Sequence, residues 1–257
     1  MKQLIKGFIL ILLLVYTSPY KAQANELSQP GLMLTFDDHS IDDWLAVQSL
    51  FDQYGAKATY YVNLLDQLTD EELTSIQRLH QLGNEIGSHG FLHLSAPDYL
   101  KEHTVEEYIQ SETVPSLQAL KALGIQATSF AYPYGARNKD TDLILLKHFK
   151  TLRGTAYLKP DQSSDQLSSI YYSFNQPREV VYGLGLDESY GYTDEEILQA
   201  LQHAVDTGQV VVFYGHRMDP TNQLEGEYTH WHRLEKILQF AKENQMTYYT
   251  ASDLLLQ

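Results

Sequence analysis

The feature that most constrains the fold of this chain is a repeated alternation of short apolar runs with longer amphipathic stretches. Each apolar run has the length of a buried strand, and each amphipathic stretch has the 3.6-residue period of a helix. Because a strand–helix–strand order predicts parallel strands, seven or eight such units predict a sheet that closes into a barrel. The expected strands are 31–36, 58–62, 85–87, 129–131, 151–154, 178–182, 210–214 and 247–249. The expected helices are 41–54, 70–82, 105–123, 140–148, 194–207 and 230–244.

The N-terminus has the composition of a targeting segment rather than of the fold. Two lysines precede an apolar stretch over 7–15, and residues 22–24 have the small side chains of a cleavage site. The apolar stretch is too short to span a bilayer, and no later segment is a better transmembrane candidate. We therefore predict a cleaved signal peptide over 1–24, a single domain over 25–257, and a secreted or periplasmic protein. An uncleaved N-terminal anchor is the alternative.

The chain is strongly acidic, with 18 Lys and Arg residues against 33 Asp and Glu residues and a net charge of −15. Binding to phosphate groups needs clustered basic side chains, so this balance argues against nucleic acid and anionic membranes as partners. It is compatible with a neutral or cationic glycan, although solubility alone also explains an acidic surface.

The chain has no cysteine, which excludes disulfides and a lipidated N-terminal cysteine. The domain is long enough to bury one large core instead. The 19 tyrosines exceed what a core requires, and aromatic faces suit the C–H surfaces of sugars. We expect a monomer, although nothing in the sequence decides the oligomeric state.

Two short motifs carry residues suited to metal chemistry. Asp37 and Asp38 follow an apolar run over 31–34, and His89 and His93 stand four residues apart. One carboxylate with two imidazoles is a common ligand set for a divalent metal, and it leaves positions open for water and substrate. If the histidine segment is a helical turn, the two imidazoles share one face. The pattern predicts a metal-dependent hydrolase, against the alternatives of a helix-capping carboxylate pair and a solvated or core histidine pair.

Four motifs in order resemble those of the polysaccharide deacetylases, the enzymes with the NodB homology domain (carbohydrate esterase family 4). They are Thr35-Phe36-Asp37-Asp38, Ser88-His89 through His93, Phe130-Ala131-Tyr132-Pro133-Tyr134-Gly135 and Val211-Val212-Phe213-Tyr214-Gly215-His216. The resemblance extends from about Pro30 to Leu255. It implies a distorted, incomplete (β/α) barrel of about seven β/α units, with the site at the C-terminal ends of the strands.

The resemblance also implies roles for individual residues. Asp38, His89 and His93 would hold the metal, with zinc as the default and cobalt or nickel as alternatives. Asp37 would be the general base and His216 the general acid. The backbone N–H of Tyr134 would stabilise the oxyanion. The residues expected to contact the substrate are Tyr132, Pro133, Tyr134, Tyr214 and, as a sugar platform, Trp231.

One residue departs from the family pattern. Ala131 stands where many members carry an arginine that pairs with the catalytic aspartate. Arg153 is the candidate to supply that charge from another strand, with Arg178 next and a plain surface arginine as the alternative. The segment 187–192 is expected to form a mobile acidic and aromatic loop over the groove.

The expected activity is hydrolytic removal of acetyl groups from an acetylated polysaccharide or oligosaccharide, most of all from N-acetylglucosamine-type units. Two alternatives remain open from the sequence. One is an O-acetyl esterase acting on a xylan-type glycan, and the other is a glycan-binding protein that keeps the barrel without turnover.

Overall fold

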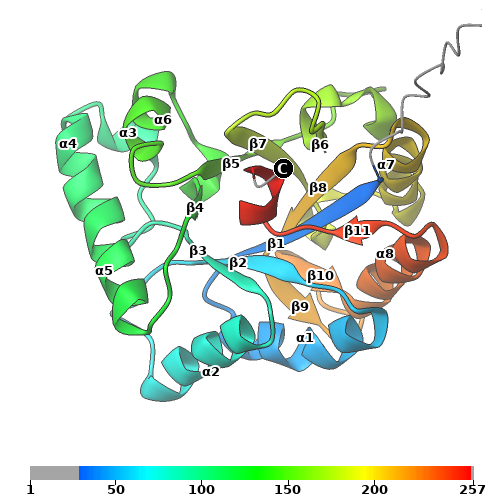
Figure 1. The fold of residues 1–257 in the computed structure, drawn as a ribbon, viewed down its shortest axis with the longest axis horizontal. Helices are drawn as coiled ribbons and strands as arrows, with labels where there is room; N and C mark the ends of the chain where they lie inside the picture. The colour runs from blue at the N-terminus through cyan, green and yellow to red at the C-terminus, as the bar shows by residue number, and fades with distance from the viewer. Residues whose placement is uncertain (1–28, 256–257) are drawn as a thin grey trace, which may run out of the picture.

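The computed structural model describes residues 29–255, and the predicted signal peptide over 1–24 lies outside them. Seven parallel strands form a closed barrel with helices around it (Figure 1). Pairing between β1 and β8 closes the barrel, in register from Gly31↔Val210 to Phe36↔Gly215. The expected (β/α) barrel is therefore confirmed. Its strands are β1 (Gly31–Asp38), β2 (Ala58–Val62), β3 (Glu85–Ser88), β4 (Ser129–Ala131), β5 (Thr151–Ala156), β7 (Val180–Gly185) and β8 (Val210–Gly215).

The barrel is irregular between β3 and β4, which share the single registered pair Ser88↔Phe130. Short strands extend the sheet outside the barrel: β11 (Thr247–Tyr248) pairs with β1, and β6 (Tyr171–Tyr172) runs antiparallel to β8. After β8, a separate two-stranded sheet joins β9 (Arg217–Asp219) to β10 (Tyr228–His230). The sequence pattern did not predict β6, β9 or β10, which are two or three residues long.

Helices connect most of the strands, and several begin at a capping box. In α2 the side chain of Thr69 accepts from the N–H of Glu72, whose carboxylate accepts from the N–H of Thr69. None of the helices within residues 29–255 is long and apolar enough to cross a membrane. The helices are α1 (Ile41–Tyr54), α2 (Asp70–Gln81), α3 (Ala96–Tyr99), α4 (Val105–Tyr108), α5 (Val114–Ala122), α6 (Lys139–Leu145), α7 (Asp194–Thr207) and α8 (Trp231–Glu243).

The helix expected over 105–123 is divided by a π-helical turn, Ile109–Thr113, between α4 and α5. Pro115 has no N–H to donate to the carbonyl four residues earlier, and its ring crowds that carbonyl. The N–H of Val114 bonds instead to the carbonyl of Ile109, five residues back. A wider turn in front of a proline accounts for the break.

The strand expected over 178–182 lies further along the chain, as β7. The guanidinium of Arg178 donates to the carbonyls of Ser169 and Tyr171, so this residue anchors the preceding loop instead. The shift matters for function, because it moves the end of this strand toward Asp187.

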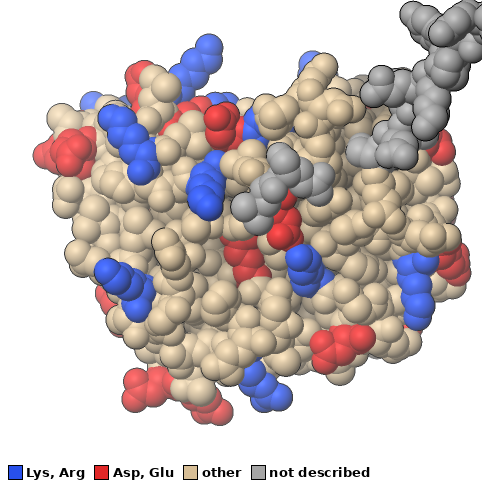
Figure 2. Space-filling view, in the orientation of Figure 1, with Lys and Arg blue, Asp and Glu red and all other residues tan. Residues whose placement is uncertain are grey.

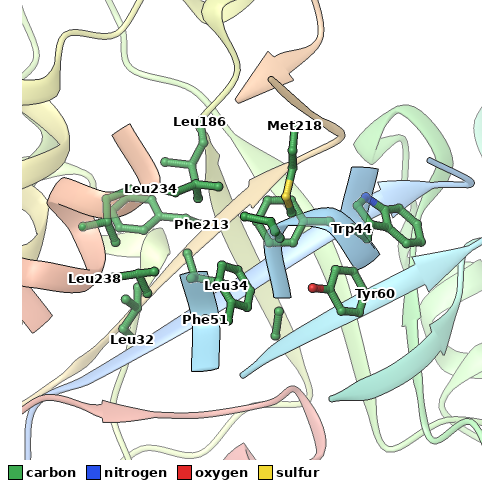
Figure 3. Close-up of a cluster of buried hydrophobic side chains, with 14 of the residues drawn as sticks. Leu32, Leu34, Trp44, Phe51, Tyr60, Leu186, Phe213, Met218, Leu234 and Leu238 are labelled. Carbon is green, nitrogen blue, oxygen red and sulfur yellow. The ribbon is translucent and has the colours of Figure 1, made fainter. Parts of the chain in front are cut away.

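Alternation along β1 divides its side chains between two cores. Leu32, Leu34 and Phe36 point outward and pack against the helices, together with Trp44 of α1 and Leu234 of α8 (Figure 3). Met33 points inward, where Tyr61, Val181 and Val212 of other strands fill the barrel. Asp37 continues the inward series, so its carboxylate points into the barrel rather than into solvent.

The N-terminal mouth of the barrel is filled by the end of the described chain, a 3₁₀ turn over Ser252–Leu255 (Figure 1). The N–H of Ser252 donates to Glu85 at the start of β3 over 2.8 Å, and Tyr172 donates to the carbonyl of Leu254 over 2.6 Å. Charged side chains of both signs are scattered over the face seen in this view (Figure 2). The polar side chains of the predicted site lie at the other end, where the strands finish.

Candidate active site

Three of the predicted metal ligands meet at the C-terminal ends of β1 and β3. Asp38 is the last residue of β1, and His89 and His93 follow β3 directly. Oδ1 of Asp38 lies 3.6 Å from Nε2 of His89 and 3.3 Å from Nε2 of His93. The two Nε2 atoms are 3.2 Å apart. The three side chains therefore aim one donor atom each at a common point.

These separations fit one tetrahedrally coordinated ion. Zinc bonds of 2.0–2.1 Å place neighbouring ligand atoms about 3.3–3.4 Å apart, and the three observed separations bracket that value. Two imidazoles and one carboxylate are also the donor types that suit zinc, cobalt or nickel. The residues present therefore fit a divalent transition metal, and all three also line the cavity described below.

The protonation of His89 is fixed by its surroundings. Its Nδ1 lies 2.9 Å from the carbonyl oxygen of Ala131, which only accepts, so Nδ1 carries the proton and Nε2 presents a lone pair. Burial lowers the pKa of His89 to about 4, and it lowers the pKa of His93 as well. Both imidazoles are therefore neutral at pH 7, as ligands must be.

Asp38 departs from regular strand geometry, with φ of 81°. The bend turns its carboxylate from the strand toward the two histidines, and Asn63 donates to its Oδ1 over 2.9 Å. His93 and Tyr134 also have positive φ, at 61° and 59°. Backbone strain of this kind is common where side chains are held for function.

Asp37 forms a buried ion pair with Arg153, which reaches it from β5. Arg153 is completely buried, and its guanidinium also lies 5.5 Å from the ring of Tyr61 and 5.0 Å from the ring of Tyr214. Burial alone raises the pKa of Asp37, but the positive charge of Arg153 and its hydrogen bond outweigh burial and hold the pKa below its ordinary value. Arg153 is thus placed to replace the arginine absent at Ala131, and it is not a surface residue.

His216 follows β8 and is bonded to a carboxylate that the sequence had not marked for this purpose. Its Nδ1 lies 2.6 Å from Oδ2 of Asp187, whose Oδ1 accepts from Thr229 over 2.6 Å. Burial lowers the pKa of His216, but the ion pair with Asp187 outweighs it and raises the pKa to about 9. His216 is therefore protonated at pH 7, with Nδ1 engaged and Nε2 free to act.

Asp187 was expected only as the start of a mobile loop over 187–192. It is instead completely buried two residues beyond the end of β7. Asp187 follows an apolar run, and the other barrel strands carry site residues at this same position after the strand. That position could have identified Asp187 from the sequence. The expected strand, 178–182, ended three residues too early, which hid this signal.

Gly215 is the last residue of β8 and directly precedes His216. A Cβ at this position would lie 2.4 Å from Oγ1 of Thr229 and 2.9 Å from Oδ1 of Asp187. The glycine is required for the close approach of the residues that support His216.

The segment that carries the two histidine ligands is not the helical turn that their spacing suggested. It is an irregular loop with φ of 78° at Gly90 and 61° at His93. The two imidazoles converge because the loop folds back, which sequence spacing cannot predict. His230 and His232 lie at the start of α8, with ring centroids 5.5 Å apart.

A cavity of about 400 Å³ joins these groups. The sequence did not single out two of its lining residues, Tyr157 and Glu227, whereas Tyr190 belongs to the segment 187–192 expected over the groove. Tyr134 and Tyr157 are the most exposed of its aromatic side chains, at 67% and 51%. The lining consists of Asp37, Asp38, His89, His93, Tyr134, Gly135, Thr155, Tyr157, Tyr190, Tyr214, His216 and Glu227.

Three residues expected to contact substrate do not line this cavity. Tyr132 is completely buried and donates to Asp142 over 2.8 Å, so it points into the core next to α6. Pro133 is buried, and the loop presents Tyr134 in its place. Trp231 packs against the main core, with its Nε1 buried. Tyr214 and Tyr134 do line the cavity, as expected.

Comparison with known proteins supports the same family as the motifs. Residues 24–150 match the family model described as polysaccharide deacetylase. A gellan lyase from Bacillus sp is 31% identical over 126 residues, which are 49% of this chain and only 5% of the lyase. Arg153, Asp187 and His216 lie beyond the residues that the family model matches.

Solved structures with low sequence identity share the fold. A carbohydrate esterase family 4 domain of a xylanase from the hindgut metagenome of Trinervitermes trinervoides has a TM-score of 0.55 at 18% identity, covering 88% of this chain and 90% of that domain. The peptidoglycan deacetylase PdaC from Bacillus subtilis has a TM-score of 0.53 at 16% identity, covering 89% and 91%. A family 4 pseudoenzyme from Bacillus anthracis has a TM-score of 0.58 at 13% identity, covering 88% and 66%.

Proposed function

We propose that the chain, whose residues 24–150 match the polysaccharide deacetylase family, is a metal-dependent hydrolase that removes acetyl groups from N-acetylglucosamine-type units of a polysaccharide. One observation carries this proposal. A three-residue metal site, the Asp37–Arg153 pair and the His216–Asp187 pair all converge on a single cavity. A base, a metal site and an acid around one cavity are the groups that amide hydrolysis requires.

Asp38, His89 and His93 would hold the metal. When bound, the ion supplies Lewis-acid polarisation of the acetyl carbonyl and a lower pKa for a bound water. Zinc is the default choice, and the same donor set also accepts cobalt or nickel.

Asp37 is the proposed general base. Its lowered pKa keeps it ionised at pH 7. Arg153 occupies Oδ2, whereas Oδ1 is buried and has no hydrogen-bond partner among residues 29–255. A buried acceptor without a partner is costly unless it is used, and a water next to the metal site would supply the missing donor.

His216 is the proposed general acid. It is protonated at pH 7, and Asp187 holds Nδ1, which leaves the Nε2 proton for the departing nitrogen. As the C–N bond of the amide breaks, this proton goes to the nitrogen, so that a free amine and acetate are released. The backbone N–H of Tyr134, in the short turn Pro133–Gly135, would donate to the oxyanion.

The cavity suits a sugar chain on the surface better than a small buried ligand. Tyr134 and Tyr157 expose large aromatic faces at its edge. The strongly acidic composition is compatible with a neutral glycan or a cationic, partly deacetylated one. We further propose that the protein acts outside the cytoplasm, on the basis of the signal-like composition of residues 1–24.

Acetate release tests the proposal. Residues 25–257 would be incubated with N-acetylglucosamine oligomers and with acetylated xylan, in added zinc and in chelator, beside the Asp37→Asn variant. We expect release from the amino-sugar oligomers that needs metal and is lost in Asp37→Asn. Acetate release from acetylated xylan alone would contradict the proposal and indicate an O-acetyl esterase. Tight zinc binding with no release from either panel would favour a glycan-binding protein, and a glycan array would then test that role.

A further inference from the structure

The loop that carries His93 has few regular backbone partners. It leaves β3 at Ser88 and adopts positive φ at Gly90 and His93. Its N–H groups point into the protein and need acceptors, because a buried unpaired N–H costs as much as a lost hydrogen bond. The position of His93 relative to Asp38 depends on how this loop is held.

One buried side chain, Glu112, supplies most of those acceptors. Its Oε2 accepts from the N–H of Phe91 over 2.5 Å and of Leu92 over 3.2 Å, and its Oε1 accepts from the N–H of Leu94 over 2.7 Å. The carboxylate therefore binds the loop on both sides of His93. Glu112 is completely buried and lies in the π-helical turn before α5.

The fit between the loop and Glu112 is close. A Cβ at Gly90 would lie 2.0 Å from Oε2 of Glu112, so only glycine lets the backbone approach the carboxylate. A second bond from the same helical segment supports the start of the loop. Ser116 bonds to Ser88 over 2.8 Å, and Oγ of Ser88 accepts from the N–H of Gly90 over 3.2 Å.

We propose that Glu112 is a positioning residue for the metal site, with Ser116 reinforcing it; this inference rests on the proposed metal-dependent function. Glu112 is neither among the residues that line the cavity nor among the candidate metal ligands, and its interaction with His93 is with the backbone N–H. It acts through the backbone of the loop, which it shapes so that Nε2 of His93 reaches the point shared with Asp38 and His89.

A glutamine at position 112 separates this role from simple packing. The side chain keeps its size and shape, but only its oxygen accepts hydrogen bonds. If the amide oxygen of the glutamine accepts from the N–H groups of Phe91 and Leu92, its NH₂ group faces the N–H of Leu94. Both of these groups are donors, so no hydrogen bond forms there. The loop must then move at one of its two ends, and the His93 imidazole moves with it.

The experiment compares zinc affinity of the wild type, Glu112→Gln and Glu85→Gln by competition with a chromophoric chelator. Glu85 is the matched control, because it starts the strand that ends beside His89 and also accepts several hydrogen bonds, from Ser129 and Ser252. We expect the zinc Kd of Glu112→Gln to rise about 10–100-fold. We expect Glu85→Gln to unfold at a lower temperature with a zinc Kd within about twofold of wild type, which is the pattern of a purely structural carboxylate.

At saturating zinc, Glu112→Gln should recover most of its kcat with an unchanged KM for the oligomer. Wild-type zinc affinity in a folded Glu112→Gln would overturn the proposal. If that variant does not fold, Ser116→Ala decides: a smaller loss of zinc affinity supports the proposal, and no change contradicts it. A wild type that binds zinc but releases no acetate contradicts the proposed function alone, since the affinity comparison is made without substrate.

Discussion

At the residue scale, two adjacent carboxylates are given opposite tasks by backbone geometry. Asp37 follows the alternation of β1 into the barrel, where Arg153 pairs with it. Asp38 leaves the strand with φ of 81° and turns toward the histidines. The sequence pattern could not assign the two roles to Asp37 and Asp38, because the roles depend on the backbone torsion at Asp38.

Removing Arg153 should leave a buried carboxylate without its partner. We expect Arg153→Met to lower the free energy of unfolding by about 3–5 kcal/mol and to abolish acetate release, because breaking a buried pair leaves an uncompensated charge. Chemical denaturation measures the first effect. Arg178→Gln is the control, since its guanidinium donates only to backbone carbonyls away from the site.

The double variant Asp37→Asn with Arg153→Met tests whether the pair itself is the cause. Removing both charges should restore part of the stability that Arg153→Met loses, since a neutral pair carries no desolvation penalty. If the double variant instead loses as much stability as the two single variants together, the two side chains are not coupled.

Asp187 should set the alkaline limit of activity. A general acid works only while protonated, so the raised pKa of His216 predicts that activity persists until the pH approaches about 9. In Asp187→Asn the pKa of His216 falls, and the alkaline limb of the kcat/KM profile moves to lower pH. Glu188→Gln, a neighbouring carboxylate paired with Arg233, should leave the limb in place. An unmoved limb in Asp187→Asn would remove His216 as the acid.

The same pair links stability to pH. Because the folded pKa of His216 lies above its ordinary value of 6.5, the pair stabilises the fold fully below pH 6.5. That contribution is lost as the pH rises through about 9. The difference in unfolding free energy between wild type and Asp187→Asn should therefore shrink across this range.

At the element scale, each strand end delivers one part of the site, and the segments around β8 depend on close backbone approach. Gly215 ends β8 where Thr229 and Asp187 leave no room for a Cβ atom. The loop after β3 likewise depends on another element, because Glu112, which binds its backbone, lies in the π-helical turn ahead of Pro115. Neither feature has a simple pattern in the sequence, since both depend on a neighbouring element.

A methyl group at position 215 should disturb the support of His216. We expect Gly215→Ala to destabilise the protein by about 1–3 kcal/mol through overpacking and to lower kcat by more than KM changes. The double variant Gly215→Ala with Thr229→Ala should recover stability without recovering kcat, because Asp187 then lacks its Thr229 bond. Recovery of both would mean that only packing matters at this strand end.

At the scale of the whole molecule, closing the barrel brings together groups that are distant in the chain. Asp37 and Arg153 come from β1 and β5, while Asp187 and His216 follow β7 and β8. With the N-terminal mouth filled by residues 252–255, the polar ends of the strands face a single cavity. The site is therefore a property of the closed sheet rather than of any one motif.

Metal binding should stabilise the folded barrel as a unit. With free zinc at about 100 times its Kd, linkage predicts a gain of about 2.7 kcal/mol in unfolding free energy, seen as a higher melting temperature. A chelator should reverse the gain and stop acetate release. The His93→Ala variant should lose the zinc-dependent gain while keeping the melting temperature of the metal-free protein. A zinc response that survives in His93→Ala would place the metal elsewhere.

The sequence by itself determined most of the barrel strands and the ligand types. Alternating apolar runs and helical periods gave the barrel strands, since burial and backbone propensity act over short windows. The ordered motifs gave Asp37, Asp38, His89, His93 and His216, because strand ends in such barrels carry the reacting groups.

Only the tertiary structure decided which of these groups meet, and how. It placed Arg153 against Asp37, brought Asp187 to His216, buried Tyr132 away from the cavity and tied the His93 loop to Glu112. Each of these contacts joins different elements of the fold. They depend on sheet closure, on backbone torsions and on the packing of a distorted helix, none of which a local sequence pattern encodes.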